Sequence, residues 1–63
     1  MSVQSVERAM AILRCLAGTE TGISEIASVT GLPKSTVSRL VSTLHDLGAV
    51  TPTAAGYRIG PLI

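Results

Sequence analysis

The tightest constraint on this chain is the short interval between two amphipathic segments. Residues 31–33 separate an apolar-periodic segment at 24–30 from a longer one at 34–47. Two helices joined by so short a turn cross at about 90–120°, and they need a small residue where they touch. They also need a turn residue that adopts positive φ. Ala27 and Gly31, four positions apart, meet these two needs. The spacing favours a helix-turn-helix over a three-helix bundle with a tight turn.

Apolar periodicity predicts three helices in all. The first spans residues 5–17 with Ser5 as its N-cap, and the second spans residues 24–30 with Ser24 in the same role. The third, over 34–47, follows Pro33, whose missing N–H suits a helix start. The residues expected to face the interior are Val6, Ala9, Met10, Ile12, Leu13, Leu16 and Ala17 in the first helix, Ile26, Ala27 and Val29 in the second, and Val37, Leu40, Val41, Leu44 and Leu47 in the third.

The period changes after Gly48. Residues 50–53 and 57–59 are short extended candidates around a turn at 54–56, which predicts a β-hairpin. Pro52 restricts the first strand to an edge, because proline has no N–H to donate to a neighbouring strand. The fold class that follows is mainly α, a winged helix-turn-helix of three helices followed by a short β-hairpin wing.

The net charge of +1 conceals an uneven distribution. Residues 1–25 hold two arginines against three glutamates, a net charge of −1. Residues 26–63 hold Lys34, Arg39 and Arg58 against a single acid, a net charge of +2. Affinity for DNA depends on where the phosphates are neutralised, so this second part is the candidate DNA-binding region.

The exposed face of the third predicted helix is rich in hydroxyls. Serine and threonine form helices less well than the lysine and glutamate of an ordinary solvated face. Hydroxyls donate to phosphates and base edges, and they permit close approach in the major groove. Arg39 is expected either to read a guanine or to hold a phosphate, whereas Tyr57 is expected to pack against the domain. The candidate DNA contacts are Lys34, Ser35, Thr36, Ser38, Arg39, Ser42 and Arg58.

The first predicted helix has a wider apolar stripe than a small core needs. The stripe covers roughly 160°, against about 100° for a helix buried on one side only. A second copy of the chain related by a two-fold axis is the simplest way to bury the surplus. Such a homodimer places two reading helices about 34 Å apart and requires a palindromic site. The candidate dimer residues are Val6, Ala9, Met10, Ile12, Leu13 and Leu16.

This chain lacks the residues that several other classes of protein need. Cys15 is the only cysteine and His45 the only histidine, so neither a disulfide nor a metal site is expected. No paired carboxylates or oriented nucleophile are present, so we expect no catalytic site and no cofactor. The longest apolar run, residues 9–13, is far short of a membrane span, and no signal peptide precedes it. A cytoplasmic protein is expected.

Several sequence strings carry a family resemblance. The strings QSVERA at 4–9, ISEIA at 23–27, TGLPKSTV at 30–37 and GYRIGP at 56–61 resemble the N-terminal DNA-binding domain of the IclR (isocitrate lyase regulator) family of bacterial transcription factors. The resemblance implies a winged helix-turn-helix over residues 1–60, a homodimer built partly through the first helix, and a separate C-terminal domain for a small-molecule effector. Residues 61–63 are then expected to begin the linker helix to that domain, which is absent from this sequence.

The function expected from residues and resemblance together is sequence-specific binding of double-stranded DNA, with helix 34–47 in the major groove. Repression of transcription is the expected mode, with activation as its alternative. The alternative function is a winged helix used for protein–protein contact. The exposed face of helix 34–47 disfavours it, because protein interfaces are enriched in aromatic residues and methionine at their centre.

Overall fold

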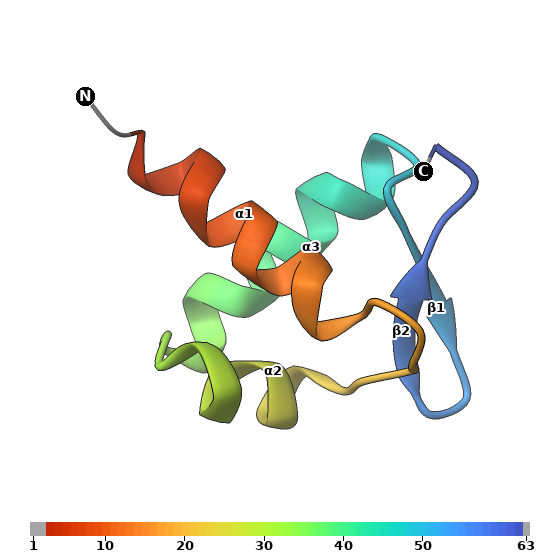
Figure 1. The fold of residues 1–63 in the computed structure, drawn as a ribbon, viewed down its shortest axis with the longest axis horizontal. Helices are drawn as coiled ribbons and strands as arrows, with labels where there is room; N and C mark the ends of the chain where they lie inside the picture. The colour runs from red at the N-terminus through yellow and green to blue at the C-terminus, as the bar shows by residue number, and fades with distance from the viewer. Residues whose placement is uncertain (1–2, 63) are drawn as a thin grey trace.

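The computed structural model describes residues 3–62 of the chain. Three helices, α1 (Gln4–Cys15), α2 (Ile23–Thr30) and α3 (Lys34–Asp46), precede two strands, β1 (Val50–Thr53) and β2 (Gly56–Ile59). Figure 1 shows the three helices packed together, with the hairpin standing at one end of them. The mainly α class and the order of elements are as predicted. The final residue of the expected linker segment, 63, lies outside the described residues.

The core is formed where the three helices and the start of the hairpin meet. Most of the residues expected to face the interior do so, but Val6, Met10, Val29 and Leu47 are 59%, 47%, 69% and 62% exposed. Ala17 is also exposed, because α1 ends at Cys15 before reaching it. Val29 lies on the side of α2 turned away from the other helices. Leu47 is the C-cap residue of α3, just before Gly48 turns the chain away at a positive φ. The fully or nearly fully buried hydrophobic residues are Ile12, Leu16, Ile26, Val37, Val41, Leu44, Ala49 and Val50.

The turn between α2 and α3 has the predicted geometry. Gly31 adopts the left-handed conformation, φ +74°, and its N–H donates to the Ala27 carbonyl at 2.9 Å. The Thr30 hydroxyl donates to the Ile26 carbonyl at 2.7 Å and accepts the N–H of Leu32 at 3.3 Å. These bonds satisfy backbone groups that a helix end leaves unpaired, so the two helices are held at a fixed angle.

The predicted serine N-caps are wrong. Val3 precedes α1 and Gly22 precedes α2 in the N-cap positions, without a side-chain cap in either case. Both helices therefore begin before the serines, and Ser5 and Ser24 lie within their first turns. At α2 the reason is tertiary, because the residue before Gly22 is bonded to the hairpin and fixes where the chain enters the helix.

The hairpin is an antiparallel pair joined by residues 54–55, with Val50 opposite Ile59 and Pro52 opposite Tyr57. A feature that periodicity did not indicate lies along its other edge. Thr21 forms an isolated β-bridge with Tyr57, through N–H to carbonyl bonds of 2.9 and 3.0 Å. The loop between α1 and α2 is thereby tied to the wing.

Gly56 makes this close approach possible. Its φ is +141°, and a Cβ at this position would lie 2.5 Å from the Thr21 carbonyl oxygen. No other residue type fits there without moving backbone, since the obstructing atom belongs to the main chain. β2 is thus hydrogen-bonded on both sides, to β1 and to the α1–α2 loop.

Candidate nucleic-acid interface

The outward face of α3 carries the polar side chains that the sequence assigns to DNA. Ser35, Ser38, Arg39 and Ser42 are all exposed along it. Opposite them, the apolar side of the helix is buried in the core. One side of α3 packs against the rest of the domain, and the opposite side is exposed to solvent along the length of the helix.

Lys34 lies at the very start of α3, where it is exposed. The first N–H groups of a helix have no partner within it, and this end of the macrodipole is positive. The first turn holds no acidic residue to balance the ammonium group. An anion at this end would contact both the lysine and the free N–H groups.

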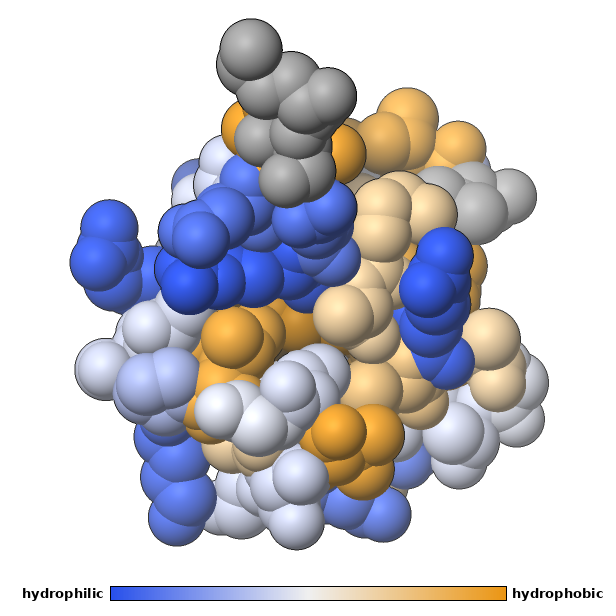
Figure 2. Space-filling view, turned by 60° about the vertical axis from the view of Figure 1, so that its left-hand side comes forward, coloured by the Kyte–Doolittle hydropathy of each residue, from blue (hydrophilic) through white to orange (hydrophobic). Residues whose placement is uncertain are grey.

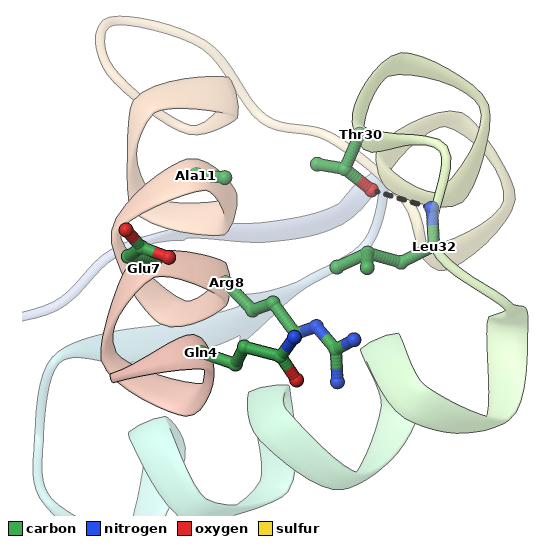
Figure 3. A pocket seen from close by; sticks show the side chains of 6 residues that line it. All are labelled: Gln4, Glu7, Arg8, Ala11, Thr30 and Leu32. Atoms are coloured by element: carbon green, nitrogen blue, oxygen red, sulfur yellow. Dashed lines mark hydrogen bonds between the residues drawn. The ribbon is translucent and has the colours of Figure 1, made fainter. Parts of the chain in front are cut away.

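One flank of α3 faces α1 and brings together two arginines. Arg8 from α1 and Arg39 from α3 line a single hollow, which the half-buried Thr36 also lines. Arg8 also lines the adjoining hollow between α1 and the helix-turn-helix turn, beside Thr30 and Leu32. Figure 3 shows its side chain extending from α1 into the space in front of that turn, away from the helix axis.

Sequence reasoning missed Arg8 because it grouped the residue with the acidic first part of the chain. The helical spacing of the sequence nevertheless indicates that Arg8 lies near the buried side of α1. Arg8 lies four positions before Ile12, about 40° around a helix of 100° per residue, and Ile12 is fully buried. A long side chain so near the buried stripe reaches the neighbouring elements instead of extending straight into solvent. The folded chain therefore places a third cation beside α3.

The other flank of α3 faces the hairpin across a second groove. Ser38, Ser42 and His45 line it from α3, and Pro52 and Tyr57 line it from the two strands. Tyr57 is half-buried and packs against the core, as the sequence predicts. The outward face of α3 is thus bounded on one side by the hollow that Arg8 lines and on the other by the wing.

Arg58 does not join this surface in the free domain. It is exposed on β2, but it lines a hollow with Gly18, Thr19 and Glu20 rather than either groove beside α3. Its carboxylate neighbour Glu20 accepts a hydrogen bond from the Thr53 hydroxyl at 3.3 Å, next to the hairpin turn. Among the seven candidate DNA contacts, Arg58 is the one that lies on the hairpin, outside α3.

A second kind of surface lies where α1 passes the C-terminal end of α3. Val6 and Met10 are 59% and 47% exposed, and Leu47 and Leu62 are also exposed. We call this surface the apolar groove. It is lined by Val6, Ala9, Met10, Leu13, Leu40, Leu44, Leu47, Ala49 and Leu62, with Ser5 and Thr43 at its rim. Figure 2 shows strongly hydrophilic side chains gathered at the upper left of the molecule and hydrophobic ones at its upper right.

Two of the six candidate dimer residues lie in the core of the domain instead of at the apolar groove. Ile12 and Leu16 are fully buried in the core of the single chain, because α1 packs against α2 and α3 through them. A side chain without exposed surface cannot contact a second copy unless the core opens. Val6, Ala9, Met10 and Leu13 are the candidates that the structure brings together at the apolar groove.

Other kinds of site have little support in the part of the chain that the structure describes. Within residues 3–62, histidine, cysteine and acidic side chains form no group of three or more that a metal ion could bind. Every buried side-chain nitrogen or oxygen in the same range has a hydrogen-bond partner. No helix in that range is long and apolar enough to cross a membrane.

The arrangement defines a class of protein. A short α2, a three-residue turn, and an α3 that exposes hydroxyls and cations beside a hairpin form a winged helix-turn-helix, the class of domain that reads duplex DNA with its second motif helix. The comparisons with known proteins give the family. The chain belongs to the IclR family, since the model of the IclR helix-turn-helix domain matches residues 5–54.

Relatives and a solved structure agree with this assignment. The glycerol operon regulatory protein of Streptomyces griseus is 43% identical over 94% of this chain. The HTH-type transcriptional regulator TtgV of Pseudomonas putida is 38% identical over 97% of it. The crystal structure of an IclR family transcriptional regulator from Brucella abortus superposes with a TM-score of 0.85 at 44% identity, over 95% of this chain and 24% of that one. The chain spans about 25% of the length of both curated relatives.

Proposed function

We propose that this domain binds double-stranded DNA sequence-specifically as the DNA-reading part of a bacterial transcriptional regulator, with α3 in the major groove. The observation that carries the proposal is the outward face of α3, where serine hydroxyls and Arg39 lie exposed between two flanking grooves. A major groove about 12 Å wide admits one helix, and its base edges present donors and acceptors to such side chains.

The proposed contacts divide by their chemistry. Arg39 is central on the exposed face, where a guanidinium can bond a guanine through two parallel N–H groups or hold a phosphate. Ser35, Ser38 and Ser42 supply short hydroxyls for base edges or phosphates along the same face. These side chains give the interface its sequence preference.

Phosphate contacts surround that reading face. Lys34 binds a phosphate at the N-terminus of α3, and Arg8 binds one from the α1 flank, with Thr36 beside it. Arg58 contacts the backbone or the minor groove from the wing. These contacts fix the register of the domain on the duplex and add affinity for every sequence alike.

We propose further that the domain acts as a homodimer on a palindromic operator. The apolar groove supports this, because exposed apolar side chains from α1, the end of α3 and residue Leu62 form one continuous surface. A two-fold axis through such a surface buries the same residues from both copies. A small-molecule effector is then bound only by a further domain of the longer protein, as the length of the relatives allows.

The remaining proposals follow from the same reading. The domain has no catalytic role and needs no cofactor, it acts in the cytoplasm, and it represses transcription by occupying its operator. A role in protein–protein contact through α3 has no support in its exposed face, which offers hydroxyls and cations where a protein interface is enriched in aromatic side chains.

Selection from a pool of randomised duplexes tests the proposal. The 63-residue chain is incubated with the pool, and bound duplexes are recovered and sequenced. The affinity of the most enriched duplex is then measured at increasing salt concentration. We expect a palindromic motif and a log–log salt slope of about −0.9 for each phosphate neutralised. A pool that stays random after repeated rounds, or binding that salt leaves unchanged, contradicts sequence-specific DNA binding.

A further inference from the structure

The groove between α3 and the wing holds the one histidine of the chain on the same stripe as two candidate DNA contacts. His45 lines the groove with Ser38 and Ser42, and these three positions fall within about 60° of each other around α3. No function follows from the sequence for this side chain. The folded chain places it opposite Pro52 and Tyr57 of the hairpin.

The two flanks of α3 differ in their charge. Arg8 and Arg39 line the flank that faces α1. The groove that faces the wing is lined by hydroxyls, an imidazole and a tyrosine ring over the buried Val41, without a permanently charged side chain among these residues. A helix lying in the major groove has one sugar–phosphate backbone on each side, so the second backbone meets this groove.

An imidazole meets a phosphate in two ways. The neutral ring donates a single N–H, whereas the protonated ring donates from both nitrogens and carries a positive charge. A charge-assisted bond to phosphate is roughly twice as strong as a neutral one. Imidazole is also the side chain that ordinarily changes its charge between pH 5 and 8.

From this placement we propose that the groove between α3 and the wing is a phosphate-binding site for the DNA strand on that side, and that His45 is its proton-dependent contact. The inference rests on the proposed DNA binding and deepens it. A protonated imidazole at His45 adds one phosphate contact, so the domain binds duplex DNA more tightly at pH 5.8 than at pH 7.5.

The groups around His45 are few. From the hairpin, Tyr57 lines the same groove. On α3 itself, Ser42 and Ser38 share its stripe, and Asp46, next to it in sequence, lies about 100° further round the helix and does not line the groove. Arg58 lines a different hollow. The chain has one histidine, so any imidazole contribution to a proton-linked change comes from His45, and the α-amino group, which also changes charge near neutral pH, is common to every variant.

The test uses the 63-residue chain and a fluorescently labelled mixed-sequence duplex, with fluorescence anisotropy at fixed sodium concentration from pH 7.5 to pH 5.8. We expect the affinity of the unchanged chain to rise about fivefold across this range and its salt slope to steepen by about 0.9. His45→Gln should bind as the unchanged chain does at pH 7.5 and should lose the response to pH. His45→Arg should bind tightly at both ends of the range.

Asp46→Asn serves as the matched control, because it also raises the net charge by one but lies outside the groove. It should strengthen binding by a similar factor at every pH and keep the response that depends on His45. Far-ultraviolet circular dichroism checks that each variant is folded, which exposed positions should allow.

An equal pH response in His45→Gln, or undiminished affinity of that variant at pH 5.8, overturns the phosphate contact while DNA binding itself stands. Absence of duplex binding by the unchanged chain and by all variants overturns the proposed function, and the contact falls with it.

Discussion

The outward face of α3 and the apolar groove are both exposed, yet their chemistry is opposite. Along α3, hydroxyls, Lys34 and Arg39 face solvent. Beside the end of the same helix, the groove presents Val6, Met10 and other large apolar side chains. One face suits phosphates and base edges, and the other suits a surface as apolar as itself.

One short chain thus exposes two surfaces of opposite chemistry. Each surface departs from an ordinary solvated surface in its own way, since serine and threonine are weaker helix formers and exposed valine and methionine gain nothing in water. The α3 flank and the apolar groove adjoin, since Ser5, Leu40 and Thr43 line both, but Arg8 lines only the first and Met10 only the second. The predictions below separate the two surfaces, beginning with the core on which both depend.

Ile26→Ala should have the largest effect, because it removes both surfaces together. Ile26 is fully buried where α2 meets the other helices, and truncation of a core isoleucine costs about 2–5 kcal/mol. Val29→Ala, three positions along the same helix but exposed, should change the free energy of unfolding by less than about 0.5 kcal/mol. Urea unfolding followed by circular dichroism measures both. Equal losses would mean that α2 packs differently.

Arg39→Ala should damage the α3 face and leave the apolar groove intact. Loss of a bidentate contact costs about 1–3 kcal/mol, so affinity for the selected duplex should fall roughly 10- to 100-fold and preference for its motif should weaken. Anisotropy titration against the selected and a scrambled duplex checks this.

Arg14→Ala is the matched control, because Arg14 is also an exposed arginine but lies in the last turn of α1. It should lower affinity for both duplexes slightly and equally. A larger loss from Arg14 than from Arg39 would place the DNA on another face.

Met10→Gln should damage the apolar groove and leave the α3 face intact. A polar side chain of similar length in the apolar groove should raise the dissociation constant of the dimer about tenfold, roughly 1.4 kcal/mol, measured by sedimentation equilibrium. Binding to a palindromic duplex should weaken, and binding to a duplex with one half-site should stay the same.

Val29→Gln makes a matched comparison, since Val29 is more exposed than Met10 but lies outside the groove. Its dimer should dissociate as the unchanged chain does. If both variants, or neither, alter the association, the apolar groove is not the surface between the two copies.

Arg8→Gln should have the smallest effect and sharpen the boundary between the surfaces. Removal of one phosphate contact should weaken binding to all duplexes alike and reduce the magnitude of the salt slope by about 0.9. The motif recovered by selection should be unchanged. A changed motif would make Arg8 a reading residue, and an unchanged slope would remove it from the interface.

Local chemistry made much of the fold predictable. Gly31 and Ala27 identify the turn because their requirements, positive φ and a small side chain, arise from neighbouring residues alone. The hairpin follows from a change of period after Gly48, and the hydroxyl-rich face follows from helical spacing in α3. The structure bears out each of these elements.

The sequence predictions fail where contacts with a distant part of the chain determine the local structure. Ser24 fails as a cap because the bridge between Thr21 and Tyr57 sets the entry to α2. Periodicity gives the apolar side of α1 but not how it divides, and packing assigns Ile12 to the core while Met10 stays exposed. Arg8 belongs beside α3 only once α1 is packed, which charge counting along the sequence does not show.

Methylation interference tests the central claim, that α3 lies in the major groove, most directly. Guanine N7 lies in the major groove and adenine N3 in the minor groove, so methylation at each reports on a different side of the selected duplex. We predict that N7 methylation at motif guanines blocks binding of the unchanged chain and that Arg39→Ala loses sensitivity at one of them. Interference from adenine N3 alone, or from neither position, would contradict the placement of α3.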